Sequence, residues 1–202
     1  MRSAGEVVGT TSTELIAQSA HLHETPPLGA LVRVKVDERL AIYAVVAGAA
    51  TDGVSAGARP VLRGREGIED AAIYRENPDL VHVLRTCFQC VVVGFCRDGA
   101  VCHFLPPTPA PIHYSVYLCG PDEVVEFTAA LGYVQMLLTA RDIPTEEVVA
   151  AHIREAAERR NPKAESAYDF TVRAGREVAA LLREDHQRLA TILQRIRRSP
   201  AL

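Results

Sequence analysis

The sequence predicts an α+β protein, in which a small antiparallel Greek-key β-barrel over residues 1–120 is followed by a helical subdomain over residues 121–202. Short runs of alternating apolar and polar residues, typical of strands, fill the first part of the chain between glycine- and proline-rich turns. From Pro121 onward the apolar residues recur with a helical period. One proline-rich segment, residues 106–111, precedes the last predicted strand.

The composition is that of a folded globular protein. The chain has 202 residues, of which 48% are hydrophobic and 23% charged, so it can bury the core of one domain with an added subdomain. No apolar run approaches the roughly 20 residues that span a bilayer. The opening Met1-Arg2-Ser3 leads into a strand pattern without a visible signal peptide. We therefore expect a cytoplasmic protein that does not enter a membrane.

The first four strands follow from alternation. Residues 5–20 contain two short strands around a turn at residues 10–12, and residues 25–29 form a proline-rich loop. Residues 29–36 are the clearest alternating strand. Residues 40–50 are almost continuously apolar, which predicts a central strand that is buried on both faces.

The middle of the chain predicts a loop, a helix and a hairpin. Residues 51–70 lack a period and predict a long loop with a short strand at residues 60–62. A short helix is expected near residues 78–86, because Asn77 suits an N-cap and Pro78 the first helical position. Strands over residues 88–96 and 100–105 should then flank a type I′ turn at Asp98-Gly99, with a last strand over residues 112–119.

Three helices are expected in the C-terminal region, over residues 122–140, 145–160 and 166–198. The third would be about 50 Å long at 1.5 Å per residue, with an apolar stripe at near-heptad spacing that Asp185 interrupts. Such a stripe needs a second surface. It predicts either an antiparallel helical subdomain or a homo-oligomer formed through the C-terminal helix.

The cysteines suggest a metal site, but their spacing does not support one. Four of the five lie around one hairpin: Cys87, Cys90, Cys96 and Cys102, with Cys119 in the next strand. On a regular strand Cys87 and Cys90 point to opposite faces, whereas Cys90 and Cys96 share a face but lie about 20 Å apart. A two-residue turn would pair Phe95 with Cys102 and Cys96 with Val101. We interpret the cysteines as packing residues; a cysteine-ligated metal or redox site is an alternative.

The histidines provide one further candidate site. His21 and His23, with Glu24 beside them, form at most a minimal metal pair and are expected on a surface loop. His113 lies between the proline connector and the last strand, where the pattern favours a half-buried ring bonded to a backbone carbonyl. A partner contact is the functional alternative. The candidate partner-binding residues are Pro106, Pro107, Pro111 and His113.

No catalytic constellation is visible in the sequence. A P-loop needs a glycine directly before its lysine, and neither Lys35 nor Lys163 follows a glycine. A zincin motif is also absent. Two acidic pairs are expected to be solvated on helix surfaces: Glu146-Glu147 and Glu184-Asp185. Three arginines lie in the last turn of the last helix, where the helix dipole stabilises positive charge: Arg195, Arg197 and Arg198. The sequence therefore predicts neither an enzyme nor a cofactor.

A set of motifs resembles the HAS-barrel domain. The opening residues 5–19 (GEVVGTTSTELIAQS), with Pro26-Pro27-Leu28-Gly29 before a hydrophobic strand, are similar to its start. Later segments agree: residues 74–80, 84–86, 91–94, 105–107 and 111–113. HAS barrels form the N-termini of HerA-type DNA translocases and of the ATP synthase alpha and beta subunits. The resemblance covers residues 5–127 and is greatest to short bacterial HAS-barrel proteins that lack the motor.

The resemblance implies a barrel that assembles with other proteins. In HerA this barrel lies on the ATPase ring, supports hexamer assembly and docks the NurA nuclease. Nothing after Pro121 resembles a RecA-like ATPase core, so neither ATP hydrolysis nor translocation is implied. We expect a non-catalytic interaction or assembly module, an accessory to a HerA-type ATPase or a NurA-type nuclease in DNA processing. The alternative is a barrel that binds single-stranded nucleic acid, which the net charge of −3 and the 5% aromatic content disfavour.

Overall fold

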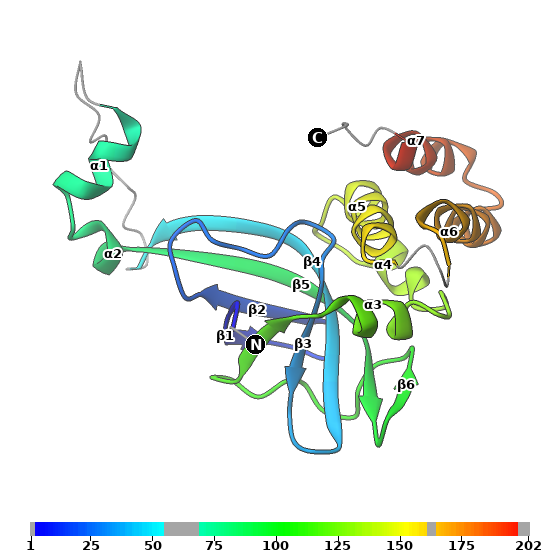
Figure 1. Cartoon of the computed structure of the whole chain (residues 1–202), viewed down its shortest axis with the longest axis horizontal. Coiled ribbons are helices and arrows are strands. Elements are labelled where there is room, and N and C mark those ends of the chain that lie inside the picture. Colours follow the sequence, from blue (N-terminus) through cyan, green and yellow to red (C-terminus); the bar gives the residue numbers. More distant parts are fainter. Residues whose placement is uncertain (1–2, 55–68, 161–164, 198–202) are drawn as a thin grey trace.

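A computed structural model describes residues 3–54, 69–160 and 165–197. It consists of a closed six-stranded antiparallel β-barrel and a helical C-terminal region (Figure 1), so the predicted fold class is confirmed. Within these residues, no helix is both long and apolar enough to cross a bilayer.

The barrel closes because β5 pairs with both β2 and β4. Around the wall the order is β1, β2, β5, β4, β3 and β7, and β7 pairs again with β1. Strands β3, β4 and β5 follow one another as neighbours and β2 lies beside β5, which is a Greek-key arrangement. The strands are β1 (Gly5–Thr10), β2 (Glu14–Ser19), β3 (Leu31–Lys35), β4 (Leu40–Gly53), β5 (Leu84–Arg97), β6 (Ala100–Cys102) and β7 (Ser115–Leu118).

Side chains from alternate strand positions fill the barrel interior. Val32 and Val34 of β3 and Val116 of β7 point inward and are buried, as the alternation in the sequence predicts. The interior is built mainly from small and branched apolar side chains, with Phe88 as its large aromatic residue: Val7, Leu15, Ala17, Ala30, Val32, Val34, Ile42, Ala44, Val46, Phe88, Cys90, Val92, Ala110 and Val116.

A second core lies between the outer face of the barrel and the helices. Tyr43 and Val45 of β4 and Val91 and Val93 of β5 point away from the barrel interior into this core. Both faces of the central strands are therefore buried, which explains the continuous apolar run that the sequence shows. The helices are α3 (Pro121–Phe127), α4 (Val134–Thr139), α5 (Thr145–Glu158), α6 (Ala167–Leu181) and α7 (His186–Arg197).

Two of the predicted helices are each divided into two shorter helices, so the prediction that they are continuous was wrong. The helix expected over residues 122–140 is broken between α3 and α4, where the Thr128 hydroxyl bonds back to the Val124 carbonyl and Gly132 follows. The helix expected over residues 166–198 is broken between α6 and α7. There a carboxylate oxygen of Asp185 accepts the backbone N–H of Arg188 and caps α7.

The break after α6 changes what covers the near-heptad stripe. Helix α7 folds back on α5, and Ile192 and Ile196 are buried in the shared core of the chain. The Glu146-Glu147 pair was expected to be solvated on a helix surface, and this expectation was wrong. Glu146 contacts Arg188 at 2.5 Å and Glu147 contacts Arg195 at 2.6 Å, so both carboxylates join α5 to α7.

The β4–β5 ribbon is longer than predicted and extends beyond the barrel (Figure 1). It ends in two short helices, α1 (Asp70–Glu76), which was not predicted, and α2 (Leu80–Val83). Asn77 does not cap the second helix. Its side-chain amide donates to the Ile73 carbonyl at 2.8 Å and closes α1, while residues 84–86 join β5. The strand predicted at residues 60–62 lies outside the described residues.

The β5–β6 hairpin has the predicted register. Asp98 and Gly99 both adopt positive φ, as a type I′ turn requires, and Phe95 pairs with Cys102. Strand β6 is shorter than expected and ends at Cys102, before the proline connector. Likewise β7 begins at Ser115 rather than at residue 112.

Candidate functional site

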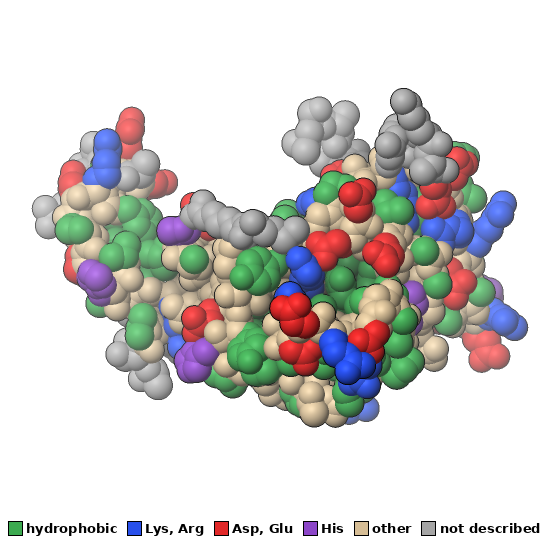
Figure 2. Space-filling view, turned by 60° about the horizontal axis from the view of Figure 1, so that its bottom comes forward, with side chains coloured by type: hydrophobic (Ala, Val, Ile, Leu, Met, Phe, Trp, Pro, Cys, Tyr) green, Lys and Arg blue, Asp and Glu red, His purple; other side chains and the backbone are tan. Residues whose placement is uncertain are grey.

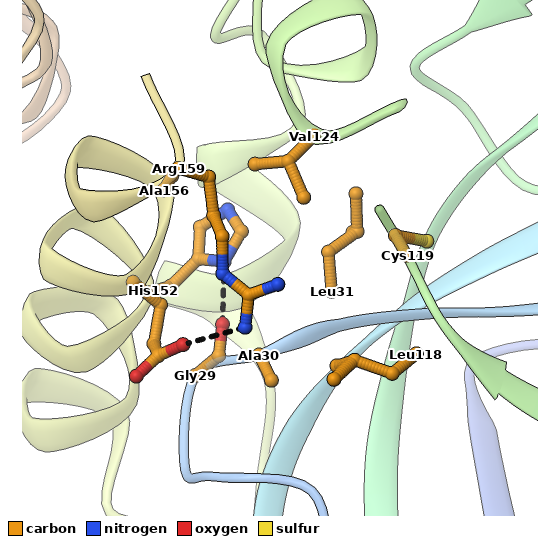
Figure 3. A pocket seen from close by; sticks show the side chains of 10 residues that line it. Gly29, Ala30, Leu31, Leu118, Cys119, Val124, His152, Ala156 and Arg159 are labelled. Atoms are coloured by element: carbon orange, nitrogen blue, oxygen red, sulfur yellow. Dashed lines mark hydrogen bonds and ion pairs between the residues drawn. The ribbon is translucent and has the colours of Figure 1, made fainter. Parts of the chain in front are cut away.

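A buried hydrogen-bonded chain joins the barrel to the helices. His152 of α5 is 2% exposed, and its Nδ1 lies 2.7 Å from the Gly29 carbonyl oxygen (Figure 3). Because a carbonyl can only accept, Nδ1 carries the proton and Nε2 accepts the Tyr133 hydroxyl at 2.7 Å. Burial lowers the pKa of His152 to about 4 and raises the pKa of Tyr133. The neutral pair is fully hydrogen-bonded, which indicates a structural link.

The backbone at Gly29 allows this contact. Its φ is +82°, and a Cβ there would overlap the backbone nitrogen of His152 and the carbonyl carbon of Ala151. Glycine therefore lets the loop approach α5 closely enough for the hydrogen bond. The sequence pattern placed Gly29 in a loop and His152 in a predicted helix, but nothing local in either segment indicated that they meet.

The cavity beside His152 is too small for a substrate. Its volume of about 10 Å³ suits roughly one water molecule, whereas ligand pockets measure about 300–1,000 Å³. Burial raises the pKa of the Cys119 thiol in its wall, which disfavours the nucleophilic thiolate. Burial also raises the pKa of Glu155, which pairs with Arg159. The cavity beside His152 is lined by Gly29, Ala30, Leu31, Leu118, Cys119, Val124, His152, Glu155, Ala156 and Arg159 (Figure 3).

A second buried network holds the helices together. The Arg160 guanidinium lies 3.3 Å from the centroid of the Phe170 ring and donates to the Thr128 hydroxyl and a Glu165 carboxylate oxygen. Arg173 also donates to Glu165, and these two guanidinium groups lower the pKa of the carboxyl group. Burial lowers the pKa of Arg160, and its hydrogen bond to Glu165 opposes this by stabilising the charged form. This network connects the end of α3 with α5 and α6.

The structure separates the cysteines. Cys90 points into the barrel beside Phe88, and Cys87 points to the other face, as predicted. The prediction that Cys90 and Cys96 share a face was wrong. Tyr43 pairs with Gly94 and Ala44 with Val92, so Val93 is an extra residue, a β-bulge, in β5. Beyond this bulge, each side chain of β5 points to the face opposite to the one that regular alternation from Cys90 would give. Among the described residues, no three His, Cys, Asp or Glu side chains are grouped as a metal ion would require.

The four predicted partner-binding residues differ in exposure and do not form one cluster. Pro106 is buried, Pro111 is half-buried, and Pro107 is exposed beside the β5–β6 hairpin. His113 lies against β1 instead, where its backbone N–H donates to the Val7 carbonyl. The prediction of a half-buried ring was wrong: the His113 side chain is 80% exposed, and its Nδ1 lies 2.6 Å from a Glu6 carboxylate oxygen.

His23 has an anchoring role that its position in a loop did not reveal. Its backbone N–H donates to the buried Thr86 hydroxyl at 2.9 Å, and its Nε2 lies 2.6 Å from the Tyr74 hydroxyl. These contacts join the loop after β2 to β5 and α1.

The first surface hollow of ligand size lies on the β5–β6 hairpin, and we call it the hairpin hollow. Its volume is about 470 Å³, and Phe104, which is 61% exposed, stands edge-on to Phe95 in its wall. The hairpin hollow is lined by Phe95, Arg97, Asp98, Ala100, Cys102, Phe104, Leu105 and Pro107. Sequence analysis assigned Phe104 and Leu105 to a strand; their position directly before two prolines was the available signal that they leave the sheet.

The second hollow lies where β5 leaves β2 and meets the helical region, and we call it the junction cleft. Its volume is about 500 Å³, with an apolar floor and charged groups at its rim. Leu105 also lines the hairpin hollow, so the two hollows meet at this side chain. The junction cleft is lined by Thr13, Glu14, Val91, Val92, Leu105, Met136, Thr139, Ala140, Arg141 and Asp142.

A third hollow, of about 430 Å³, lies on β3 and β7 and is lined by Arg33, Lys35, Ser115 and Tyr117. The Arg33 guanidinium lies 2.9 Å from a Glu123 carboxylate oxygen of α3, and Lys35 lies 3.9 Å from Glu38. Figure 2 shows charges of both signs among hydrophobic side chains on the face of the molecule that it presents. That face does not carry a continuous basic field.

No protein-family model matches the sequence, and no curated protein matches it significantly.

Proposed function

We propose that this protein is a non-catalytic interaction module, a HAS-like barrel that docks a protein partner through its outer surface. The observation that carries the proposal is the pair of hollows that open on this surface and meet at Leu105. The 61% exposed Phe104 stands beside them. Exposed aromatic and aliphatic side chains next to a hollow are typical of protein-binding surfaces.

The engagement of the buried polar groups supports a role without catalysis. His152, Tyr133 and Arg160 are satisfied by contacts within the chain, and the cavity beside His152 holds about one water molecule. A catalytic site would instead direct such groups into a cleft of substrate size.

The sequence resemblance supports a partner of the HerA or NurA type. The test is co-elution in size-exclusion chromatography of the purified chain with the HerA-type ATPase and with the NurA-type nuclease of the same organism. We expect one of the two to co-elute with the wild type. If neither co-elutes, both partners are rejected.

Matched variants locate the contact. Phe104→Asp should abolish co-elution, because it places a charge in the apolar wall of the hairpin hollow. Tyr168→Asp is the control, since Tyr168 of α6 is a 76% exposed aromatic residue that lines neither hollow. Equal loss in both variants would contradict docking at this surface.

Single-stranded nucleic acid is the second candidate ligand, favoured by the hollow that Arg33, Lys35 and Tyr117 line together. The test is fluorescence anisotropy with a labelled oligothymidine at low and moderate salt. Binding that weakens steeply with salt and is lost in Lys35→Glu would support this function. Absence of binding at low salt would remove it.

A further inference from the structure

The two hollows share the Leu105 side chain in their walls, and we call them together the Leu105 trough. The hairpin hollow contributes Phe95, Phe104 and Pro107, the junction cleft contributes Val92 and Met136, and Leu105 belongs to both. The trough runs from the helix-covered face of β5 at Val91 to the β5–β6 hairpin, and it crosses the part of the β5 edge that neither β2 nor β6 pairs with. Its apolar middle and charged ends indicate the chemistry of its ligand.

The length of the trough suits a short extended chain. Val91 and Arg97 mark its two ends and are six positions apart on β5, one of which is the bulged Val93. Their side chains therefore point to opposite faces of β5, and the trough crosses the strand edge between β2 and β6. Five strand steps of about 3.3 Å correspond to about 17 Å, or about five extended residues. A helix of that length would be about 10 Å wide and would contact the trough along only one stripe.

The backbone of β6 also favours an extended ligand. Arg97 and Ala100 flank the two-residue turn and form a hydrogen-bonded pair, so the next pair, Cys96 and Val101, is not hydrogen-bonded. The N–H and C=O groups of Val101 therefore point away from β5. Among the described residues no backbone group pairs with them. An edge strand of only three residues is too short to promote aggregation. It can still pair with one extended peptide through the two backbone hydrogen bonds of Val101.

Opposite charges mark the two ends of the trough. Asp98 is engaged by Arg39 through two contacts, of 2.6 and 2.9 Å, whereas Arg97 lies over the Phe95 ring at 5.6 Å. Arg97 takes part in no ion pair within the described part of the chain. Its positive charge therefore remains available at this end.

The junction cleft supplies the opposite sign. Glu14 and Asp142 contribute two carboxylates against the single guanidinium of Arg141, and the structure joins none of the three in an ion pair with another described residue. This end is therefore net negative. A ligand that complements the whole trough carries an acidic group at the Arg97 end and a basic group at the Glu14 end.

We infer that the Leu105 trough binds an extended segment of a partner protein, about five residues long. Its centre is apolar and packs on Leu105, an acidic residue contacts Arg97, and a basic residue contacts Glu14 and Asp142. This inference rests on the proposed interaction function and specifies the part of the partner that is recognised.

The experiment begins with a phage-displayed library of random heptapeptides, panned on the immobilised full chain. We expect the enriched sequences to share an apolar centre with an acidic residue on one side and a basic residue on the other. The best synthetic peptide is then measured by fluorescence polarisation. Arg97→Glu should weaken its binding about five- to tenfold, since one surface charge contact is reversed. Circular dichroism checks that the variant is folded.

Charge exchange separates recognition from general damage. A peptide whose acidic residue is replaced by lysine should bind Arg97→Glu better than it binds the wild type. Glu14→Lys should show the mirror result with a peptide whose basic residue is replaced by glutamate. Arg183→Glu is the control, because Arg183 is an exposed arginine on the turn after α6 and lines neither hollow.

Three results with the peptides or with the chain alone would overturn the inference. They are the absence of the opposite-charge pattern among enriched peptides, unchanged affinity in both charge variants, and self-association of the chain that Arg97→Glu abolishes. The last would assign the trough to a second copy. Co-elution of a HerA- or NurA-type partner with a variant that carries both Arg97→Glu and Glu14→Lys, at wild-type strength, would reject the trough while the interaction function stands. Failure of the wild type to co-elute rejects those partners instead.

Discussion

The buried His152 makes the stability of this protein depend on pH in a predictable direction. Its folded pKa of about 4 lies below the ordinary value of 6.5, because burial disfavours the imidazolium ion. Between these values the unfolded chain binds more protons than the folded chain, so the free energy of unfolding rises with pH. The contribution is complete above about pH 6.5 and is lost as the pH falls through about 4.

The magnitude follows from the difference between the two pKa values. The two pKa values differ by about 2.5. The free energy of unfolding therefore falls, relative to high pH, by about 3 kcal/mol when the pH is below both values and by about 2 kcal/mol at pH 5. The perturbation is His152→Gln, which removes this titration and keeps a polar side chain of similar size. At pH 8 we expect a loss of about 1–3 kcal/mol, since the bonds to Gly29 and Tyr133 are disturbed.

The assay is urea unfolding at pH 8 and pH 5, followed by circular dichroism because the chain has no tryptophan. The wild type should lose about 2 kcal/mol more than His152→Gln between the two pH values. His186→Gln is the matched control, since it makes the same substitution at an exposed position of α7 and keeps His152, so the loss assigned to His152 should remain. An identical pH dependence in the wild type and in His152→Gln would refute the reasoning.

Three further outcomes test the packing. Gly29→Ala should destabilise the fold by more than about 3 kcal/mol in thermal or urea unfolding, because positive φ and the overlap with α5 act together. In the control Gly48→Ala the new Cβ meets nothing within 4 Å, so a cost as large would contradict the argument. Asp185→Ala should cost about 1 kcal/mol through loss of the α7 cap, and an unchanged midpoint would exclude this role. A thiol reagent should leave Cys90 and Cys119 unmodified in the native state, and rapid modification of all five thiols would show that neither is buried.

The local features of the barrel were accessible from the sequence because short-range sterics decide them. Asp98-Gly99 allows positive φ at two consecutive residues, so both the turn type and the pairing of Phe95 with Cys102 followed directly. The alternation in β3 identified Val32 and Val34 as interior residues for the same kind of reason.

Longer-range features were not accessible in this way. The bulge at Val93 depends on how β5 pairs with β4, and one extra residue was enough to reverse the facing of Cys96 relative to Cys90. The prediction of one long C-terminal helix was wrong, because the apolar stripe resumes after Asp185 and the periodicity alone did not show that the helix ends there. The break became favourable only when α7 could pack on α5 and pair Arg188 with Glu146.

The candidate binding surface shows the same division. The proline connector drew attention to Pro107, which does line the hairpin hollow, but its neighbours Phe104 and Leu105 were hidden within a predicted strand. His113 was expected to be half-buried and bonded to a backbone carbonyl, and its actual contact with Glu6 could be seen only after β7 was placed beside β1.

Periodicity and turn chemistry in the chain were sufficient for the fold class, because alternation, helical spacing and positive-φ residues act within a few positions of one another. The meeting of the two hollows at Leu105, and of His152 with Gly29, required the tertiary structure. Glu14, Arg97 and Arg141 are far apart in sequence and acquire a common role only when the barrel closes and the α4–α5 turn lies against it. Barrel closure and helix packing bring these groups together through contacts between distant residues, and no local pattern records those contacts.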